Sequence, residues 1–309
     1  MAAKADTPLN QTRDESLEKS RATSRMGILI EFSRARLITA VTLSGALGYV
    51  LFRGRQLELS FVFVILGVLF LGCGCSALNQ IQEARTDAIM ARTRNRPLPA
   101  GQLSLGQGWF VTMALLFVGF YFLACIERYT TIILGLGLFS LVWYNGVYTY
   151  LKGVTSLAVF SGAVLGAIPP LMGWCAAGGF WHDSTIWIVA FYFFIWQIPH
   201  FWLLMLLRGR EYELAGLKSV TKIFSMEQLG RIIFVWLAIT ALIGFFTAHF
   251  IDAAYPWRLA ILIASGWLVG RSLFFLKGQW PTTQLRPAFL RCIYYNILFM
   301  LFMALDALL

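Results

Sequence analysis

The stretch FVFVILGVLFLGCGCSALNQIQEARTDAIMARTRNRPLPAG, residues 61–101, joins an apolar run directly to a segment crowded with acids and arginines. The apolar part belongs to a run long enough for a helix that crosses a bilayer, which needs about 20 residues. Because the polar part follows without a linker, it is expected at the membrane surface. The stretch therefore predicts a membrane fold that gathers charge at one end of a helix.

The rest of the chain repeats this apolar pattern. Its 309 residues are 59% hydrophobic and only 13% charged, which excludes a soluble surface over most of the length. Apolar runs predict nine crossings, at residues 36–52, 57–78, 107–126, 130–148, 158–178, 185–206, 231–251, 256–276 and 288–308. We expect an all-α, polytopic membrane protein.

The N-terminal residues differ in character. Residues 1–27 mix both signs of charge with Ser and Thr and have no apolar core of a signal peptide, so we expect a disordered cytoplasmic tail. Residues 28–309 are expected to form the transmembrane domain. The five cysteines lie in or beside apolar runs without a CxxC pair, which is typical of packing residues.

The distribution of basic residues predicts the orientation. With the N-terminus inside, only Arg53, Arg55, Arg128 and Arg258 of the 25 Lys and Arg residues fall on the outer side. The positive-inside rule therefore favours a cytoplasmic N-terminus and a C-terminus on the opposite side. It also explains the net charge of +10 without a nucleic-acid partner, and no nucleic-acid motif is present.

The polar segment after the second crossing is the first candidate site. Asn79, Glu83 and Asp87 are spaced four residues apart, which places them on one face of a continuous helix. Two carboxylates and an amide oxygen suit Mg²⁺, whose other positions are filled by water and phosphate oxygens. Arginines 92, 94 and 96 follow, and their planar forks match phosphate. The alternative is that the two acids only pair with neighbouring arginines at the interface.

A second charged loop follows the sixth crossing and emerges on the same side. It offers Arg208, Arg210, Glu211 and Tyr212. Taken alone this loop is an amphipathic connector. If it faces the first loop across a central cavity, it supplies a second metal or phosphate contact.

Two further polar groups lie inside the apolar runs. Tyr148 and Lys152 are four residues apart at the inner end of the fourth crossing, where a lysine either meets a phosphate or marks the membrane border. In FFIWQIPHFWLLMLL, Gln197 and His200 lie among aromatic residues. A buried histidine is usually a packing residue, but its aromatic neighbours favour a large flat substrate.

These residues resemble a known family. NQIQEARTDAIMARTRNRPLPAGQLS is similar to the first motif of the UbiA superfamily of membrane prenyltransferases, in the form used by its heme O synthase (protoheme IX farnesyltransferase) branch. YTYLKGVTSLAVFSGAVLGAIPPLMGW, WQIPHFW and REYELAG resemble later motifs of that branch, and EFSRARLITAVTLSGALGYVL resembles its first helix. The sequence departs from the branch at Gly153, at Glu211 and in LKSVTKIF.

The resemblance implies a UbiA-type bundle around a central cavity in a bacterial inner membrane. It implies transfer of a farnesyl group from farnesyl diphosphate to a vinyl group of protoheme (heme B), with Mg²⁺ as cofactor. Asn79, Glu83 and Asp87 would hold the metal, with Glu211 as a further ligand, and Tyr148 and Lys152 complete the candidate catalytic set. The candidate substrate-binding residues are Arg34, Arg36, Arg92, Arg94, Arg96, Arg208, Arg210, Tyr212, Gln197 and His200.

Two alternatives stay open from the sequence. One is a UbiA-type prenyltransferase that acts on another acceptor, such as a quinone or chlorophyll-type precursor. The other is an inner-membrane transporter or assembly scaffold, which would need neither carboxylate. The resemblance also makes heme A synthase and the terminal oxidases candidate assembly partners.

Overall fold

The computed structural model of the chain describes residues 24–214, 223–278 and 280–309. Within these ranges every regular element is helical and no strand is present. Most of the predicted tail, residues 1–27, lies outside them, and α2 (Arg25–Phe32) begins just before its expected end. The all-α fold class is therefore confirmed, whereas the domain boundary stays a prediction.

In the described ranges, nine helical segments are long and apolar enough to cross a bilayer. They are α3 (Ala35–Arg53), α4 (Leu59–Gln82), α6 (Leu105–Ala124), α7 (Thr130–Val142) continued by η1 (Trp143–Tyr148) and α8 (Thr149–Val154), α9 (Ala158–Ala176), α10 (Ser184–Leu214), α11 (Met226–Phe250), α12 (Tyr255–Gly270) followed by η3 (Leu273–Leu276), and η4 (Thr282–Gln284) leading into α13 (Leu285–Leu308). The predicted crossings are confirmed, and the chain is a multi-pass membrane protein.

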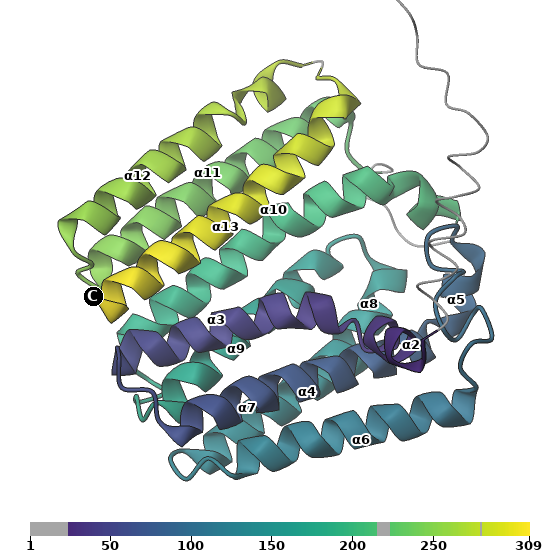
Figure 1. Ribbon diagram of the computed structural model, residues 1–309. Coiled ribbons are helices and arrows are strands. Elements are labelled where there is room, and N and C mark those ends of the chain that lie inside the picture. The colour runs from purple at the N-terminus through teal and green to yellow at the C-terminus, as the bar shows by residue number, and fades with distance from the viewer. Residues whose placement is uncertain (1–23, 215–222, 279) are drawn as a thin grey trace, which may run out of the picture.

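Helix α9 is the centre of the bundle. Of its most apolar stretch 72% is buried, against 50% or less for every other crossing in the described ranges. It packs against α3, α4, α7 and α10, while α11, α12 and α13 pack on the far side of α10 (Figure 1). A cavity beside α9 is therefore surrounded by helices from the first two thirds of the chain.

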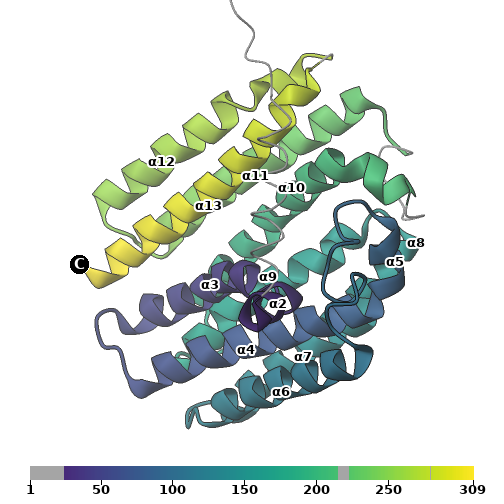
Figure 2. The ribbon, with the colours of Figure 1, turned by 45° about the vertical axis from the view of Figure 1, so that its right-hand side comes forward.

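The charged segments gather at one end of the bundle. The short helix α5 (Ala84–Ile89) and α8 both lie at the end opposite the C-terminus in the two views (Figure 1, Figure 2). The far end of α10 reaches the same side. This arrangement agrees with the expectation that the first and second charged loops emerge on one face.

Glycines let α3 and α9 approach closely. A Cβ atom built at Gly48 would lie 2.0 Å from the carbonyl oxygen of Pro170, and one at Gly173 would lie 1.9 Å from that of Gly45. Small residues at such contacts let the backbones of membrane helices meet. The contact fixes the position of α9 against α3.

Gly48→Ala is expected to destabilise the protein by about 1–3 kcal/mol, because the added methyl group must displace the Pro170 carbonyl. Thermal unfolding in detergent measures the effect. Gly135→Ala in α7 is the matched control, since a Cβ atom at Gly135 has no neighbour within 4 Å. Equal melting temperatures for the two variants would contradict the packing described here.

Candidate functional site

The acidic motif does not lie on one continuous helix, which corrects the expectation from its spacing. Helix α4 ends at Gln82, and Glu83 adopts φ −95° and ψ 4° before α5 begins. The loop after α5 folds back, and the Thr93 hydroxyl donates to the Asp87 carbonyl at 2.9 Å. The helical spacing assumes an unbroken helix. The geometry of Asn79, Glu83 and Asp87 therefore depends on this interruption.

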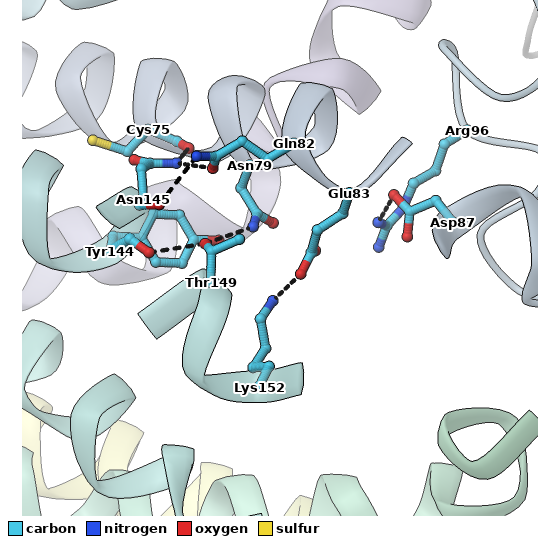
Figure 3. A network of polar contacts seen from close by, with 10 residues as sticks. All are labelled: Cys75, Asn79, Gln82, Glu83, Asp87, Arg96, Tyr144, Asn145, Thr149 and Lys152. Atoms are coloured by element: carbon cyan, nitrogen blue, oxygen red, sulfur yellow. Dashed lines mark hydrogen bonds and ion pairs between the residues drawn. The ribbon is translucent and has the colours of Figure 1, made fainter. Parts of the chain in front are cut away.

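Each carboxylate of the motif pairs with one base (Figure 3). Glu83 Oε1 lies 2.5 Å from Lys152 Nζ, and Asp87 Oδ2 lies 2.5 Å from an Arg96 guanidinium nitrogen. Burial and the nearby Arg34 lower the pKa of Arg96, whereas Asp87 raises it. A guanidinium nevertheless stays charged at neutral pH. The alternative from the sequence, in which both acids pair with neighbouring arginines, therefore holds for Asp87 but not for Glu83, whose partner is Lys152 of the distant α8.

Two oxygens of the motif are buried without a hydrogen-bond partner among the described residues: Asn79 Oδ1 and Asp87 Oδ1. The other end of the Asn79 amide is fixed, because Nδ2 donates to Thr149 Oγ1 at 3.0 Å. Such oxygens are the ligands that hard cations take. In the part of the chain that the structure describes, no cluster of three His, Cys, Asp or Glu residues forms a metal site. A divalent cation bound here would therefore take the side-chain amide oxygen of Asn79 as a ligand in addition to carboxylate oxygens.

A π-helical turn, η1, presents the next part of the site. It is tied to α4 by a pair of amides: Gln82 Nε2 donates to the Asn145 carbonyl at 3.0 Å, and Asn145 Nδ2 donates to Gln82 Oε1 at 3.1 Å and to the Cys75 carbonyl at 3.0 Å (Figure 3). Single π-turns in helices are frequent at functional sites. This turn directs Tyr144 and Tyr148 to the same side.

The aromatic rings of this turn contact the basic residue that follows it. The rings of Tyr144 and Tyr148 stack with centroids 5.8 Å apart. Lys152 Nζ lies 5.0 Å from the centre of the Tyr148 ring, within the range of a cation–π contact. The lysine is therefore placed by both Glu83 and Tyr148.

The two carboxylates, the two tyrosines, Arg96 and Lys152 line one cavity of about 460 Å³, a size that small-molecule sites commonly have. Asn79 is not on the wall of this cavity. Its walls come from α3, α4, α5, the segment after α5, α7, η1, α8, α9 and α10. The charged residues on its wall are Arg34, Glu83, Asp87, Arg92, Arg96 and Lys152. The residues farthest from them along the helices are apolar, namely Val41, Val68, Leu71, Leu165, Pro169 and Met172. The cavity can therefore hold an anionic head group with an apolar tail.

The predicted basic residues divide between the cavity and the surface. Arg34, which begins α3 in a left-handed conformation with φ 50°, lines the cavity, as do Arg92 and Arg96. Arg36 and Arg94 are exposed and are not on the cavity wall. Arg34 reaches the cavity from the residue that precedes α3, whereas Arg36 lies within the helix and is exposed.

Of the two substrate-binding residues predicted within the sixth crossing, one lies on the cavity wall and the other does not. Gln197 lines the cavity, where its amide packs against Gly166 of α9. His200 is not on the cavity wall: its ring lies 4.9 Å from that of Phe289 in α13 and 5.1 Å from that of Trp196. The structure therefore places the His200 ring against α13 and outside this cavity, and its role as a substrate contact stays a prediction.

The second charged loop cannot be compared with its prediction. The side chains of Arg208, Arg210, Glu211 and Tyr212 lie outside the described residues. Their roles as metal or phosphate contacts stay predictions.

Sequence reasoning missed Gln82, Asn145 and Thr149, which orient the site. The available signal was their polarity, because amide and hydroxyl side chains inside a membrane segment usually face a partner or a cavity. Their partners are 63 to 70 residues away in the chain, so local spacing does not reveal them.

Comparison with known proteins supports one family. The sequence pattern of the UbiA prenyltransferase family matches residues 39–296. The protoheme IX farnesyltransferase of Nitratidesulfovibrio vulgaris is 34% identical over 213 residues, which are 68% of this chain and 71% of that protein. The protoheme IX farnesyltransferase of Geobacter sulfurreducens is 44% identical over 155 residues, 50% of this chain and 56% of that protein.

Solved structures share the fold at low sequence identity. A UbiA homolog from Aeropyrum pernix K1 superposes with a TM-score of 0.70 at 17% identity, covering 87% of this chain and 98% of that one. A UbiA homolog from Archaeoglobus fulgidus bound to GPP and Mg²⁺ gives a TM-score of 0.63 at 16% identity, with coverage of 90% and 98%. The helical arrangement around the cavity is therefore that of the UbiA fold.

Proposed function

Because the chain belongs to the UbiA prenyltransferase family, we propose that it transfers a farnesyl group from farnesyl diphosphate to a vinyl group of heme B, forming heme O. The observation that carries this proposal is a cavity with a charged end and an apolar interior. The relatives named protoheme IX farnesyltransferase support the choice of prenyl donor and acceptor.

The charged end is suited to the diphosphate. Arg34, Arg92, Arg96 and Lys152 bring four positive charges to the wall, against the two carboxylates of Glu83 and Asp87. Guanidinium groups bind phosphate through paired hydrogen bonds, and a lysine acts as a point charge. The surplus of positive charge favours a diphosphate there, and the apolar walls favour its prenyl tail.

Magnesium fits the same end. Glu83 and Asp87 line the cavity, and Asp87 Oδ1 is buried and unpartnered among the described residues, so these two residues would hold the ion. Asn79 is not on the cavity wall, but its Oδ1 is likewise buried and unpartnered and would be a further ligand. A bound Mg²⁺ would neutralise charge on the diphosphate. The Mg²⁺ in the UbiA homolog from Archaeoglobus fulgidus supports the choice of metal.

The residues of the chain perform the remaining tasks of the reaction. The bond between the first prenyl carbon and oxygen breaks, and the diphosphate leaves with the electron pair, stabilised by Lys152 and the arginines. Tyr144, Tyr148 and Phe201 line the cavity, and the faces of their rings would stabilise the allylic cation. The vinyl group then bonds to that cation, and water adds to the carbon left positive and loses a proton. Apolar walls exclude water until the acceptor has reacted.

The proposed orientation in the membrane rests on the distribution of basic residues. We propose a bacterial inner membrane with the charged end of the cavity and the N-terminus on the cytoplasmic side, as the positive-inside rule predicts. Heme A synthase and terminal oxidases, which would receive the product, are the proposed assembly partners.

The expected product decides the proposal. When the chain is incubated with heme B, farnesyl diphosphate and Mg²⁺, mass analysis should detect a porphyrin that carries a hydroxyethylfarnesyl group. The exposed Asp252→Asn variant, at the opposite end of the bundle, should give the same yield. Prenylation of a quinone or chlorophyll-type precursor, with heme left unchanged, would overturn the choice of acceptor. Absence of diphosphate release with every acceptor would overturn prenyl transfer itself.

A further inference from the structure

The cavity has a defined depth. Fifteen residue steps separate Val68 on α4 from Glu83 at its C-terminal end, which is about 22 Å at about 1.5 Å per residue. Ala158 and Met172, both on α9, are separated by about 21 Å by the same rise. Val68 and Met172 are thus the lining residues most distant from the ion pairs on their two helices.

The deep end is closed by packed side chains. Val68, Leu71 and Met172 line the cavity yet are only 6%, 3% and 2% exposed. All three belong to an apolar cluster that continues beyond the cavity through Leu123 and Ile133. A tail that enters from the charged end therefore meets a wall at this level.

The backbones of both helices that carry the closing residues are held in place. A Cβ atom at Gly119 of α6 would lie 2.5 Å from the Leu71 backbone nitrogen, so α6 holds α4 in place there. The backbone of α9 is held beside Met172, because Gly173 meets the Gly45 carbonyl of α3. The unbranched Met172 side chain is therefore the part of the end wall whose size and rotamer can change.

We infer that Met172, supported by Val68 and Leu71, sets the length of prenyl chain that the cavity accepts. This inference rests on the proposed function, because it takes the diphosphate to sit among the ion pairs. A chain longer than the distance to Met172 must displace packed atoms. A shorter chain leaves apolar surface unfilled and binds more weakly.

The test replaces Met172 by a smaller and by a larger residue. Met172→Ala should raise use of geranylgeranyl diphosphate relative to farnesyl diphosphate by about tenfold or more, the discrimination that small changes in an apolar pocket produce. Met172→Phe should shift the preference by a similar factor toward geranyl diphosphate. The measurement is competition among the three diphosphates, with product masses counted.

A matched control variant distinguishes an effect of cavity depth from a general loosening of the cavity wall. Met205 also lines the cavity, but at the charged end of α10, so Met205→Ala should keep the farnesyl preference of the parent chain. Unchanged preference in both Met172 variants, or an equal shift in Met205→Ala, would overturn the inference.

Binding measurements test the chain-length preference without depending on which acceptor the protein uses. Inhibition by unreactive thio-analogues of the three diphosphates reports chain-length preference whatever the acceptor is. If Met172→Ala does not fold, Met172→Val and Met172→Phe still test the direction of the shift. If no product forms on heme while the analogues show the expected shift, the proposed acceptor fails and the inference stands.

Discussion

Asp87→Asn is expected to lower diphosphate release in the presence of Mg²⁺ by about 10²–10³-fold, the loss seen when one electrostatic contact to a transition state is removed. The substitution keeps the shape of the side chain but removes its charge. Asp87 is 1% exposed, and while Oδ2 pairs with Arg96, Oδ1 is buried without a partner among the described residues. Release of diphosphate from farnesyl diphosphate, titrated with Mg²⁺ in the presence of heme, measures the effect.

The control for this variant is Asp252→Asn. Asp252 also pairs with an arginine, Arg258 at 3.4 Å, but its side chain is 88% exposed and lies outside the cavity. Its substitution should leave release unchanged. Near-normal release by Asp87→Asn, with an unaltered dependence on Mg²⁺, would show that the carboxylate only orients Arg96.

The membrane helices could be predicted from the sequence because a crossing requires a continuous apolar run, which is a local property. Two starts were predicted too late. Helix α11 begins at Met226 rather than residue 231, because Ser225 and Gln228 form a capping box that starts the helix among polar residues. The last crossing likewise begins at Thr282 rather than residue 288. Apolar runs mark the membrane core and omit polar first turns.

The candidate site could be predicted in composition but not in contacts. The sequence identifies Glu83, Asp87, Arg96 and Lys152 as members of one charged site, and the structure brings them to one cavity. It does not reveal that Lys152 pairs with Glu83, because that contact depends on how α8 meets the end of α4. The tertiary packing of the helices determines which charged side chains form ion pairs.

The breaks in regular helix were also beyond sequence reasoning. The interruption at Glu83 and the π-turn at residues 143–148 occur within segments whose apolar and polar pattern fits ordinary helices. Both are stabilised by side chains from elsewhere in the chain, as the bonds of Asn145 to Gln82 and Cys75 illustrate. Hydrophobic periodicity predicts that a segment is helical, but it does not predict a break or a π-turn within that helix.

Lys152→Met is expected to lower turnover by about 10²-fold, mainly in kcat. The Lys152 ammonium lies 2.5 Å from Glu83 and 5.0 Å from the centre of the Tyr148 ring, on the cavity wall. A departing diphosphate gains charge as its bond to the prenyl carbon breaks, so a cation held there stabilises the transition state more than the bound substrate. Single-turnover consumption of farnesyl diphosphate measures the change in rate.

A structural role for the same ion pair predicts a different pattern, and the double variant Glu83→Gln/Lys152→Met separates the two. The side chains of Glu83 and Lys152 are only 21% and 19% exposed, so removing one partner is expected to cost about 3–5 kcal/mol of stability. The double variant leaves no unpaired charge and should recover most of the thermal stability that Lys152→Met loses. If the pair served packing alone, turnover would recover with stability. Because we assign both groups to the diphosphate end of the cavity, the double variant should melt near the parent chain and still fail to release diphosphate.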